Sequence, residues 1–554
     1  MDIPSTLNPI DIAVILAYVA GVVGFGAWFV RKSSSPEEFM AAGRSLPGWA
    51  IGLSIFGTYV SSISFLANPG KSFSANWNPF VFGLALPIAA LIATKYFVPF
   101  YRKSGEISAY SHLEHRFGAW ARTYVVICYL LTQIVRIGAI MLLVAIALKK
   151  LTGWDEETII IATGILVTVY TLLGGIEAVI WTDVVQSIVL TIGALVCVAL
   201  IVTRMPEGAG QVFTIAAEHD KFSLGGFGPS LASSTFWVIL IYGLFENLKN
   251  FGIDQSYVQR YIAAKSEADA RRSVWIGTLL FVPTSALLFF IGTALFSYYY
   301  SQPELMKELV PAGATLDDGT TLAANETDPE VIGQFVSGDD VFPHFIVHEL
   351  PAGLTGLLIA AIFAAAMSSV DSSLNGSATL ILIDVYKRYF RPNAGKRESM
   401  VVLYTTTLVW GALGTVIAIA LIPVDSVLDA WWKVSAILGG GMLGLFLLGI
   451  ISQRAGNPAA VTGVVVGILV ITWLTLNQME AKTIDGVKSL STGLHEWLLS
   501  VIDWYEAYSF PIDGVLTLVI GTLVIFFVGI CVSLFFGRPP APRDELPADR
   551  SPGD

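Results

Sequence analysis

The chain has 554 residues, of which 54% are hydrophobic and only 14% are charged, and its formal net charge is −11. Soluble globular domains carry about 25% charged residues, so this composition excludes an ordinary soluble protein and predicts an all-α polytopic membrane protein. The acidic balance leaves no basic patch, so we expect no nucleic-acid partner. The three cysteines are scattered and give neither a disulfide framework nor metal-ligand spacing.

Apolar runs long enough to cross a bilayer follow one another along the chain. A spanning helix needs roughly 20 apolar residues, and we count about thirteen such runs. They centre near Val22, Ile55, Ala90, Leu142, Ile165, Leu190, Leu240, Leu280, Ile362, Val409, Leu443, Val466 and Leu523. We number them span 0 to span 12. No cation precedes span 0, whose first basic neighbours are Arg31 and Lys32, so it does not resemble a cleaved secretory signal.

The distribution of lysine and arginine predicts the orientation. With the N-terminus outside, the segments that alternate to the cytoplasm hold twenty of these cations, Arg260 among them, and the outer segments hold eight. The positive-inside rule then favours an outer N-terminus and a cytoplasmic C-terminus in an inner (plasma) membrane. We expect residues 1–537 to form a single transmembrane transporter domain with an acidic outer loop at 301–341, and residues 538–554 to form a disordered cytoplasmic tail.

Two spans are interrupted by polar residues at mid-depth. Span 1 contains "LSIFGTYVSSISFLANPG" (53–70), and span 6 contains "LIYGLFENLKNFGIDQSYVQR" (240–260). The backbone can leave helical geometry inside a membrane only where it lines a cavity or is buried in protein. The two spans are five helices apart, which makes the second block of five inverted relative to the first. Broken helices at matching positions of inverted halves indicate the binding site of a secondary transporter. The alternative is two ordinary helices whose polar faces pack together.

Span 8 carries "AAAMSSVDSSLN" (364–375), whose small and hydroxylated residues share one face. Ala365, Ser368, Ser369 and Ser372 follow at i, i+3, i+4 and i+7, and Asp371 lies beside them. A small hard cation prefers several oxygen ligands, so this face predicts an ion site. The alternative is that each serine bonds to a carbonyl of its own helix or packs as a small residue.

A second carboxylate, Asp183, lies early in span 5. A carboxylate at this depth needs a cation or strong hydrogen bonds, which makes it a candidate for the same ion site. The alternative is an interfacial helix cap, with Thr182 and Asp183 beginning a helix.

Several motifs together resemble the sodium:solute symporter family. They are the interrupted span 1, "GGIEAVIWTDVVQ" (174–186), "NFGIDQSYVQRYIAA" (250–264) and "AAAMSSVDSSLN" followed by "IDVYKR" (383–388). The family includes sodium–glucose, sodium–proline and bacterial sialic acid symporters. The resemblance implies a LeuT-type five-plus-five inverted repeat with broken helices 1 and 6, which works by alternating access.

The resemblance also implies which residues hold sodium. A first Na⁺ would lie between spans 1 and 8, with the carbonyls of Gly57, Val60 and Ala365 and the hydroxyls of Ser368 and Ser369 as ligands. A second Na⁺, found in some bacterial members, would match Asp183, Ser368 and Ser372. Asp371 stands where the sialic acid type has a serine, so this carboxylate would either tighten a second cation or hold a proton.

The same resemblance suggests the solute. Arg136, deep in span 3, matches the arginine that holds the substrate carboxylate in sialic acid symporters, and an arginine fork suits a planar carboxylate. The alternative for Arg136 is a structural ion pair with Glu246. The other residues expected to line the solute site are Thr58, Ser61, Ser64, Asn247, Asn250 and Phe251. At Gly83, relatives have glutamine or glutamate, so the contacts to sugar hydroxyls differ here.

We therefore predict a sodium-coupled symporter of an organic solute, with Na⁺ as its ion, acting as a monomer. The expected cargo is a carboxylated sugar such as sialic acid. The alternatives are a neutral sugar or polyol such as glucose, galactose or inositol, and then a monocarboxylate or an amino acid. The sequence contains no nucleophile–base or metal constellation, so we predict no enzymatic activity and no catalytic residues.

Overall fold

The computed structural model of the protein describes residues 7–29, 35–311, 313–316, 320–323, 325–423, 427–476 and 511–536. The secondary structure of these residues is helical, apart from two isolated β-bridges. This confirms the expected all-α class. The expected tail at 538–554 lies outside the described residues.

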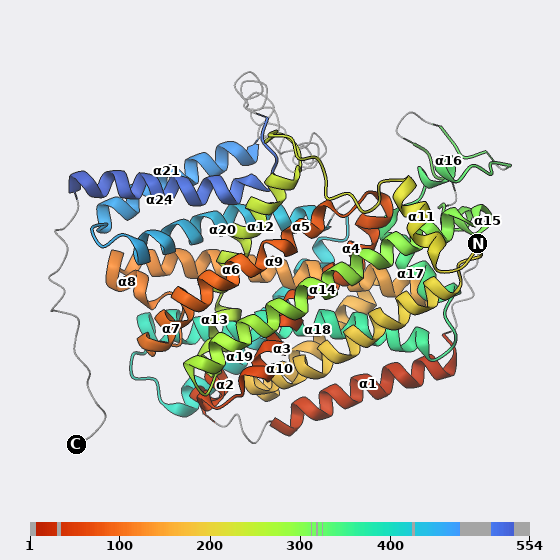
Figure 1. The fold of residues 1–554 in the computed structure, drawn as a ribbon. Coiled ribbons are helices and arrows are strands. Elements are labelled where there is room, and N and C mark those ends of the chain that lie inside the picture. Colours follow the sequence, from red (N-terminus) through yellow and green to blue (C-terminus); the bar gives the residue numbers. More distant parts are fainter. Residues whose placement is uncertain are drawn as a thin grey trace, which may run out of the picture. The chain divides into compact units, whose positions relative to one another are not determined.

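Helices of very different lengths follow one another along the chain (Figure 1). Their bounds are α1 (Pro9–Trp28), α2 (Pro36–Ala41), η2 (Ala42–Arg44), α3 (Gly48–Tyr59), α4 (Ser62–Ser74), η3 (Asn78–Phe80), α5 (Val81–Leu84), α6 (Leu86–Ile92), η4 (Ala93–Phe97), α7 (Val98–Ser104), α8 (Ser111–Phe117), α9 (Ala119–Thr152), α10 (Glu156–Thr203), α11 (Gly210–Glu218), α12 (Phe236–Ile253), α13 (Gln255–Ala263), α14 (Glu267–Tyr300), α15 (Pro303–Lys307), α16 (Pro329–Gly333), α17 (Gly338–His348), α18 (Leu354–Leu380), η5 (Ile381–Phe390), α19 (Lys396–Ala420), α20 (Val427–Ile451), α21 (Asn457–Leu476) and α24 (Leu516–Phe536).

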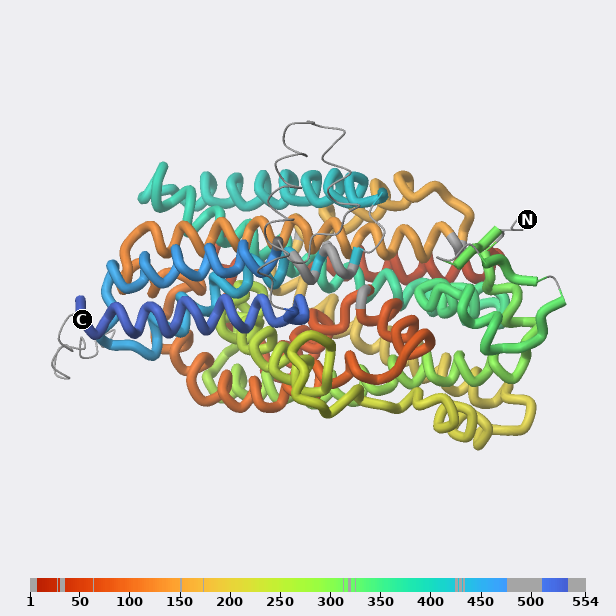
Figure 2. Tube along the Cα trace, turned by 90° about the horizontal axis from the view of Figure 1, so that it is seen from above, coloured from red at the N-terminus to blue at the C-terminus, as the bar shows by residue number. Residues whose placement is uncertain are grey.

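The chain divides into two compact units. The first comprises Met1–Ala109 and Tyr129–Val434, and the second comprises Tyr110–Cys128 and Ser435–Asp554. In the second unit, α21 and α24 run side by side, as Figure 2 shows in blue. They approach closely because α21 presents glycines there: a Cβ on Gly467 would lie 2.2 Å from Ile525. All residues of the predicted ion and solute sites belong to the first unit.

Ten helices among the described residues are long and apolar enough to cross a membrane, and the bent pair α3–α4 makes an eleventh. The two remaining expected runs, around Ile165 and Leu240, form the first part of α10 and the helix α12. The count of thirteen spans and the inverted repeat stay predictions.

Span 1 is broken, as the sequence predicts. Its halves α3 and α4 meet at an angle of 50°. Val60, between them, has non-helical torsions (φ −88°, ψ 83°), and Ser61 caps α4 by accepting a hydrogen bond from the backbone N–H of Ser64 at 3.5 Å. A serine at this position satisfies one of the amide groups that a helix start leaves without a partner.

Span 6 differs from the expectation that its polar residues at mid-depth interrupt it. The helix α12 continues through Glu246 and Asn250 to Ile253, and the break lies at Asp254. Two local interactions explain the shift. Lys249 donates to Glu246 one turn away at 2.6 Å, so these charges are paired without leaving the helix. The side chain of Asp254 accepts the backbone N–H of Ser256 at 2.8 Å, which starts α13.

Spans 4 and 5 form the single long element α10, which kinks at Gly175. This glycine has φ +58° and ψ −162°, and a Cβ there would lie 2.9 Å from the backbone of Phe39. Only glycine combines this conformation with so close an approach. The kink places Asp183 two turns inside a continuous helix, so the alternative of an interfacial cap at Thr182 and Asp183 is wrong.

The helix α18 lies at the centre of the first unit. It packs against α10, α1, α19, α3, α13 and α4 (Figure 1), and it is the most deeply buried of the candidate spans. Because its polar residues face these neighbours rather than lipid, the serines and aspartate of span 8 are compatible with a membrane.

Candidate functional site

Asp183 joins three helices at a fully buried point. Its Oδ1 accepts a hydrogen bond from Ser368 of α18 at 2.5 Å, and its Oδ2 accepts one from Ser54 of α3. All three side chains are at most 1% exposed. The predicted meeting of spans 1, 5 and 8 is therefore present in the structure, with Asp183 as its centre.

Arg260 of α13 lies against the same carboxylate. Its Nη2 donates to Oδ2 of Asp183 at 2.9 Å and to Oγ of Ser372 at 2.8 Å, and its Nε donates to Oγ of Ser54 at 2.7 Å. The guanidinium is fully buried. Arg260, which sequence analysis counted among the cytoplasmic cations, lies in the helix α13, whose nine residues are all buried, rather than in an exposed segment.

The position of α13 is fixed by hydrogen bonds at its middle and at its C-terminal end. Gln259 donates to the carbonyl oxygen of Met40 and to the side chain of Asn375 in α18, at 2.6 and 2.7 Å. At its C-terminus, Arg102 donates to the carbonyls of Ile262 and Ala264. These contacts satisfy polar groups that burial would otherwise leave unpaired, and they hold Arg260 against the ion-site residues.

Asp371 adds a second buried carboxylate. Its Oδ2 accepts a hydrogen bond from the hydroxyl of Tyr170 in α10 at 2.7 Å, and its Oδ1 lies 3.3 Å from Oγ of Ser372. Sequence analysis missed Ser54, Tyr170 and Arg260. Asp254 in "GIDQS" is a residue type that caps the start of a helix, so it would have indicated that a helix containing Arg260 begins there.

The first predicted ion set is partly assembled. Gly57 of α3 lies so close to α18 that an added Cβ would be 3.0 Å from Oγ of Ser368 and 2.9 Å from Oγ of Ser187. Ser369 points along its own helix, with its hydroxyl 3.4 Å from the carbonyl oxygen of Ala365. The structure therefore brings Gly57 and Ser368 together.

The predicted solute residues of α3, α4 and α9 meet at the broken helix. Arg136 is half-buried, and its Nη2 lies 3.4 Å from the carbonyl oxygen of Thr58 in the last turn of α3. Ser61 caps the start of α4, and the hydroxyl of half-buried Ser64 lies 3.5 Å from the carbonyl oxygen of Tyr59. The ion pair of Glu246 is with Lys249, so the alternative partner proposed for Arg136 is already engaged.

The predicted residues of α12 divide between two environments. Phe251 is fully buried and packs edge-on against Tyr59 at a centroid distance of 5.7 Å, next to the break of span 1. Asn250 is half-buried. Asn247 is fully buried and donates to the carbonyl oxygen of Phe82 at 3.3 Å, so its amide fastens α12 to α5.

Comparison with known proteins shows to which family the chain is similar. A model of the sodium:solute symporter family matches residues 39–467. The chain belongs to the sodium:solute symporter family. This symporter is 35% identical over 466 residues to the sodium/sialic acid symporter SiaT of Proteus mirabilis, with 83% of the chain and 88% of the relative covered. It is 33% identical over 473 residues to the sodium/sialic acid symporter NanT of Aliivibrio fischeri, with 85% and 88% covered.

A solved structure of a Na⁺-coupled sialic acid symporter in a substrate-bound outward-open state shares its fold. The TM-score is 0.79 at 31% identity, with 97% of this chain and 99% of that chain covered. The chain is thus a multi-pass membrane transporter that uses Na⁺, as the sequence analysis predicted.

Proposed function

We propose that this symporter carries a carboxylated sugar such as sialic acid together with Na⁺ into the cell. The observation that carries the proposal is Arg136, a half-buried guanidinium beside the break between α3 and α4. Among the described residues, the only hydrogen bond of Arg136 is to the carbonyl oxygen of Thr58. A guanidinium inside a membrane protein without an opposite charge is costly unless it serves an anion. A carboxylate between Arg136 and the N-terminal amides of α4 would meet a bidentate donor and the positive end of a helix.

Phe251 and Ser64 complete the proposed solute site. The buried aromatic ring at the break would cover an apolar face of a sugar, and the Ser64 hydroxyl would bond to a polar group of the solute. The names of both bacterial relatives support sialic acid as the cargo. Thirteen spans, an inner-membrane location, an outer N-terminus and a monomeric state belong to the same proposal, and the excess of inner cations supports the orientation.

Charge at the centre of the first unit supports a second Na⁺. If both are ionised, the carboxylates of Asp183 and Asp371 place two negative charges there against the one positive charge of Arg260. An uncompensated charge in so buried a place is strongly unfavourable. The balance then requires one more monovalent cation, which is either Na⁺ or a proton on Asp371. We propose that a second Na⁺ binds between Asp371, Asp183 and Ser372, while the first lies at Gly57, Val60, Ala365, Ser368 and Ser369.

Uptake into proteoliposomes tests the cargo. We expect labelled sialic acid to accumulate with an inward Na⁺ gradient, and not when K⁺ replaces Na⁺. Arg136→Ala should abolish this uptake, whereas Arg271→Ala, which removes an exposed arginine paired with Glu267, should leave it intact. Sodium-dependent uptake of glucose or galactose without sialic acid would refute the carboxylate assignment and leave the family assignment standing.

The reversal potential of transport in the same vesicles tests the second ion. Each Na⁺ moved through 100 mV contributes about 2.3 kcal/mol, so two ions per anionic solute leave a net charge that one ion does not. We expect a ratio of two in the natural chain and one in Asp371→Ala, which leaves neither a carboxylate nor a hydroxyl at this position. An electrically silent natural chain would contradict the second site.

A further inference from the structure

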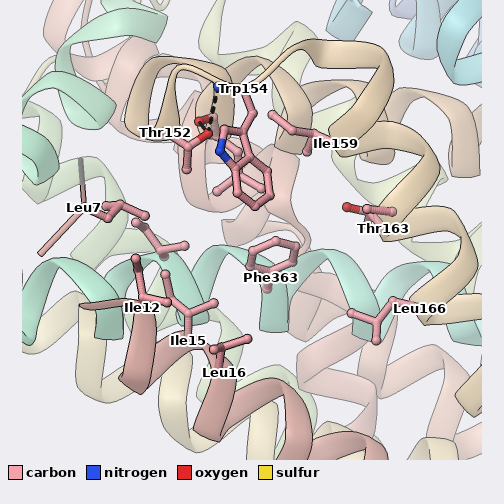
Figure 3. Close-up of a pocket in the computed structure, with 13 residues that line it drawn as sticks. Leu7, Ile12, Ile15, Leu16, Thr152, Trp154, Ile159, Thr163, Leu166 and Phe363 are labelled. Atoms are coloured by element: carbon pink, nitrogen blue, oxygen red, sulfur yellow. Dashed lines mark hydrogen bonds between the residues drawn. The ribbon is translucent and has the colours of Figure 1, made fainter. Parts of the chain in front are cut away.

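A cavity of about 650 Å³ lies outside the ion and solute sites, between α1, the end of α9, the start of α10 and α18 (Figure 3). Eleven of its thirteen lining residues are apolar. A volume of this size suits a small organic ligand, but the walls offer almost no polar group to orient one. Its occupant must be recognised by shape and by apolar contact.

On two of the helices, residues that line the cavity follow one another along the helix axis. On α10 the lining runs from Ile159 to Leu166, which is about 10 Å at 1.5 Å per residue. On α18, Ile359 and Phe363 lie one turn apart and face the same space. All four helices include candidate membrane spans or continue directly into one. An apolar slot that follows membrane-spanning helices for about 10 Å can take part of a lipid acyl chain.

One side of the slot is polar. Thr152 and Trp154, from the connection between α9 and α10, lie together on one side in Figure 3, with the backbone N–H of Trp154 donating to Oγ1 of Thr152 at 3.2 Å. The Trp154 side chain is 62% exposed, and Lys149 pairs with Glu156 nearby at 3.1 Å. Tryptophan and lysine gather at the level of lipid headgroups. The slot thus has a polar rim at one side and an apolar body, which matches an amphipathic molecule.

We propose that this slot binds one acyl chain of a membrane phospholipid, with the headgroup at Trp154. Moving a chain from the bilayer into the slot gains no hydrophobic free energy, because lipid tails are equally apolar. Retention depends instead on packing: an empty slot leaves its lining atoms without contacts on one side. The bound chain fills the space between α1 and α10 and supports Phe363, five residues before Ser368.

The N-terminal end of α1 is hydrogen-bonded to the start of α18. A bound lipid would therefore add a second contact that holds α1 in place. Asp11 accepts hydrogen bonds from the backbone N–H groups of Gly353 and Gly356 at the start of α18, at 2.7 and 2.8 Å. The slot extends to both sides of this contact, with Leu7 before Asp11 and Ile12, Ile15 and Leu16 after it. A chain in the slot therefore connects α1 to α10 beside this hydrogen-bonded contact.

Native mass spectrometry of the full chain, purified in mild detergent and supplied with palmitoyl-oleoyl phosphatidylglycerol, tests the proposal. We expect one retained lipid per chain. Ala162→Trp, which fills the slot, should lower its occupancy about tenfold, equivalent to about 1.4 kcal/mol of binding. The matched control is Ile165→Trp on the same helix, at a 61% exposed position that does not line the slot, and it should retain the lipid.

Thermal unfolding provides a second readout that does not depend on transport. Delipidation should lower the melting temperature of the natural chain and of Ile165→Trp, and added phosphatidylglycerol should restore it, because a ligand of the folded state stabilises that state. Ala162→Trp should be insensitive to lipid in both directions. Equal lipid retention in Ala162→Trp and Ile165→Trp would overturn the proposal, as would occupancy of the slot by detergent alone.

Discussion

The guanidinium of Arg260 donates to the Asp183 carboxylate at 2.9 Å, with both side chains fully excluded from solvent. The pair joins α13 to α10, and the same guanidinium reaches Ser372 of α18. An internal cation thus touches two residues that sequence analysis assigned to a second sodium. A second Na⁺ at the proposed site would act on the same carboxylate as Arg260, which would couple the occupancy of the ion site to the contact between α13 and α10.

Replacing Arg260 should make stability depend more steeply on sodium. Arg260→Met leaves Asp183 and Asp371 without their internal cation, and breaking a buried pair costs about 3–5 kcal/mol. Added Na⁺ should recover part of this loss, because an ion that binds only the folded state stabilises it. Thermal unfolding in NaCl against choline chloride at equal ionic strength measures the effect. Arg271→Met is the control. An unchanged Na⁺ dependence in Arg260→Met would contradict the coupling.

Gly57→Ala should impair sodium binding without unfolding the protein. The added methyl would lie within 3.0 Å of the hydroxyls of Ser187 in α10 and Ser368 in α18, so these hydroxyls or α3 itself must shift. We expect a higher half-saturating Na⁺ concentration for uptake and a lower maximal rate. Gly21→Ala, at a position on α1 with nothing within 4 Å, should behave like the natural chain. Equal Na⁺ dependence of the two variants would show that Gly57 does not contribute to the ion site.

Asp11→Ala should destabilise the start of α18. Its carboxylate serves two amide groups of that helix and is 4% exposed, so water replaces it poorly. A lost helix cap costs about 1–2 kcal/mol. Asp155→Ala removes an exposed cap of α10 and should cost less. Unfolding in mixed micelles with increasing dodecyl sulfate compares the two, and Asp11→Asn should retain most of the stability because its amide oxygen still accepts.

Lys221 should give stability an alkaline pH dependence. Its ammonium donates to the carbonyl oxygen of Phe73 at 2.6 Å and lies 3.8 Å from the ring centroid of Phe296, and burial lowers the pKa of Lys221 from 10.5 to about 8. Between these values the unfolded chain binds more protons than the folded one, so stability should rise with pH across that window. The melting temperature from pH 7 to 10.5 tests this.

Two variants separate Lys221 from other alkaline titrations. Lys221→Met should lose the rise between pH 8 and 10.5, whereas Lys265→Met, at a mostly exposed lysine, should keep it. The same rise in all three proteins would assign it to other groups.

The sequence by itself determined the class and the family, and it predicted that Asp183 and Ser368 meet, as they do in the structure. Hydropathy predicted the membrane helices because burial in lipid demands long apolar runs, and helical periodicity put Ser368 and Ser372 on one face. Polar residues inside an apolar run also predicted that span 1 is broken, because the backbone can leave helical geometry in a membrane only where it lines a cavity or is buried in protein. The structure places this break at Val60. These signals depend on residues that are close together in the sequence, so they can be recognised without the tertiary structure.

Only the tertiary structure determined which charged and polar residues pair with one another. Arg260 and Asp183 are 77 residues apart, and no local pattern distinguishes a buried arginine from one in a cytoplasmic loop. The same is true of Asp11, whose partners Gly353 and Gly356 lie more than 340 positions away. Span 6 breaks at Asp254 and not at Glu246, because Glu246 pairs with Lys249 one turn away in the same helix. Such pairings depend on which helices pack together, because Coulomb and hydrogen-bond energies act over a few ångströms in space rather than along the sequence.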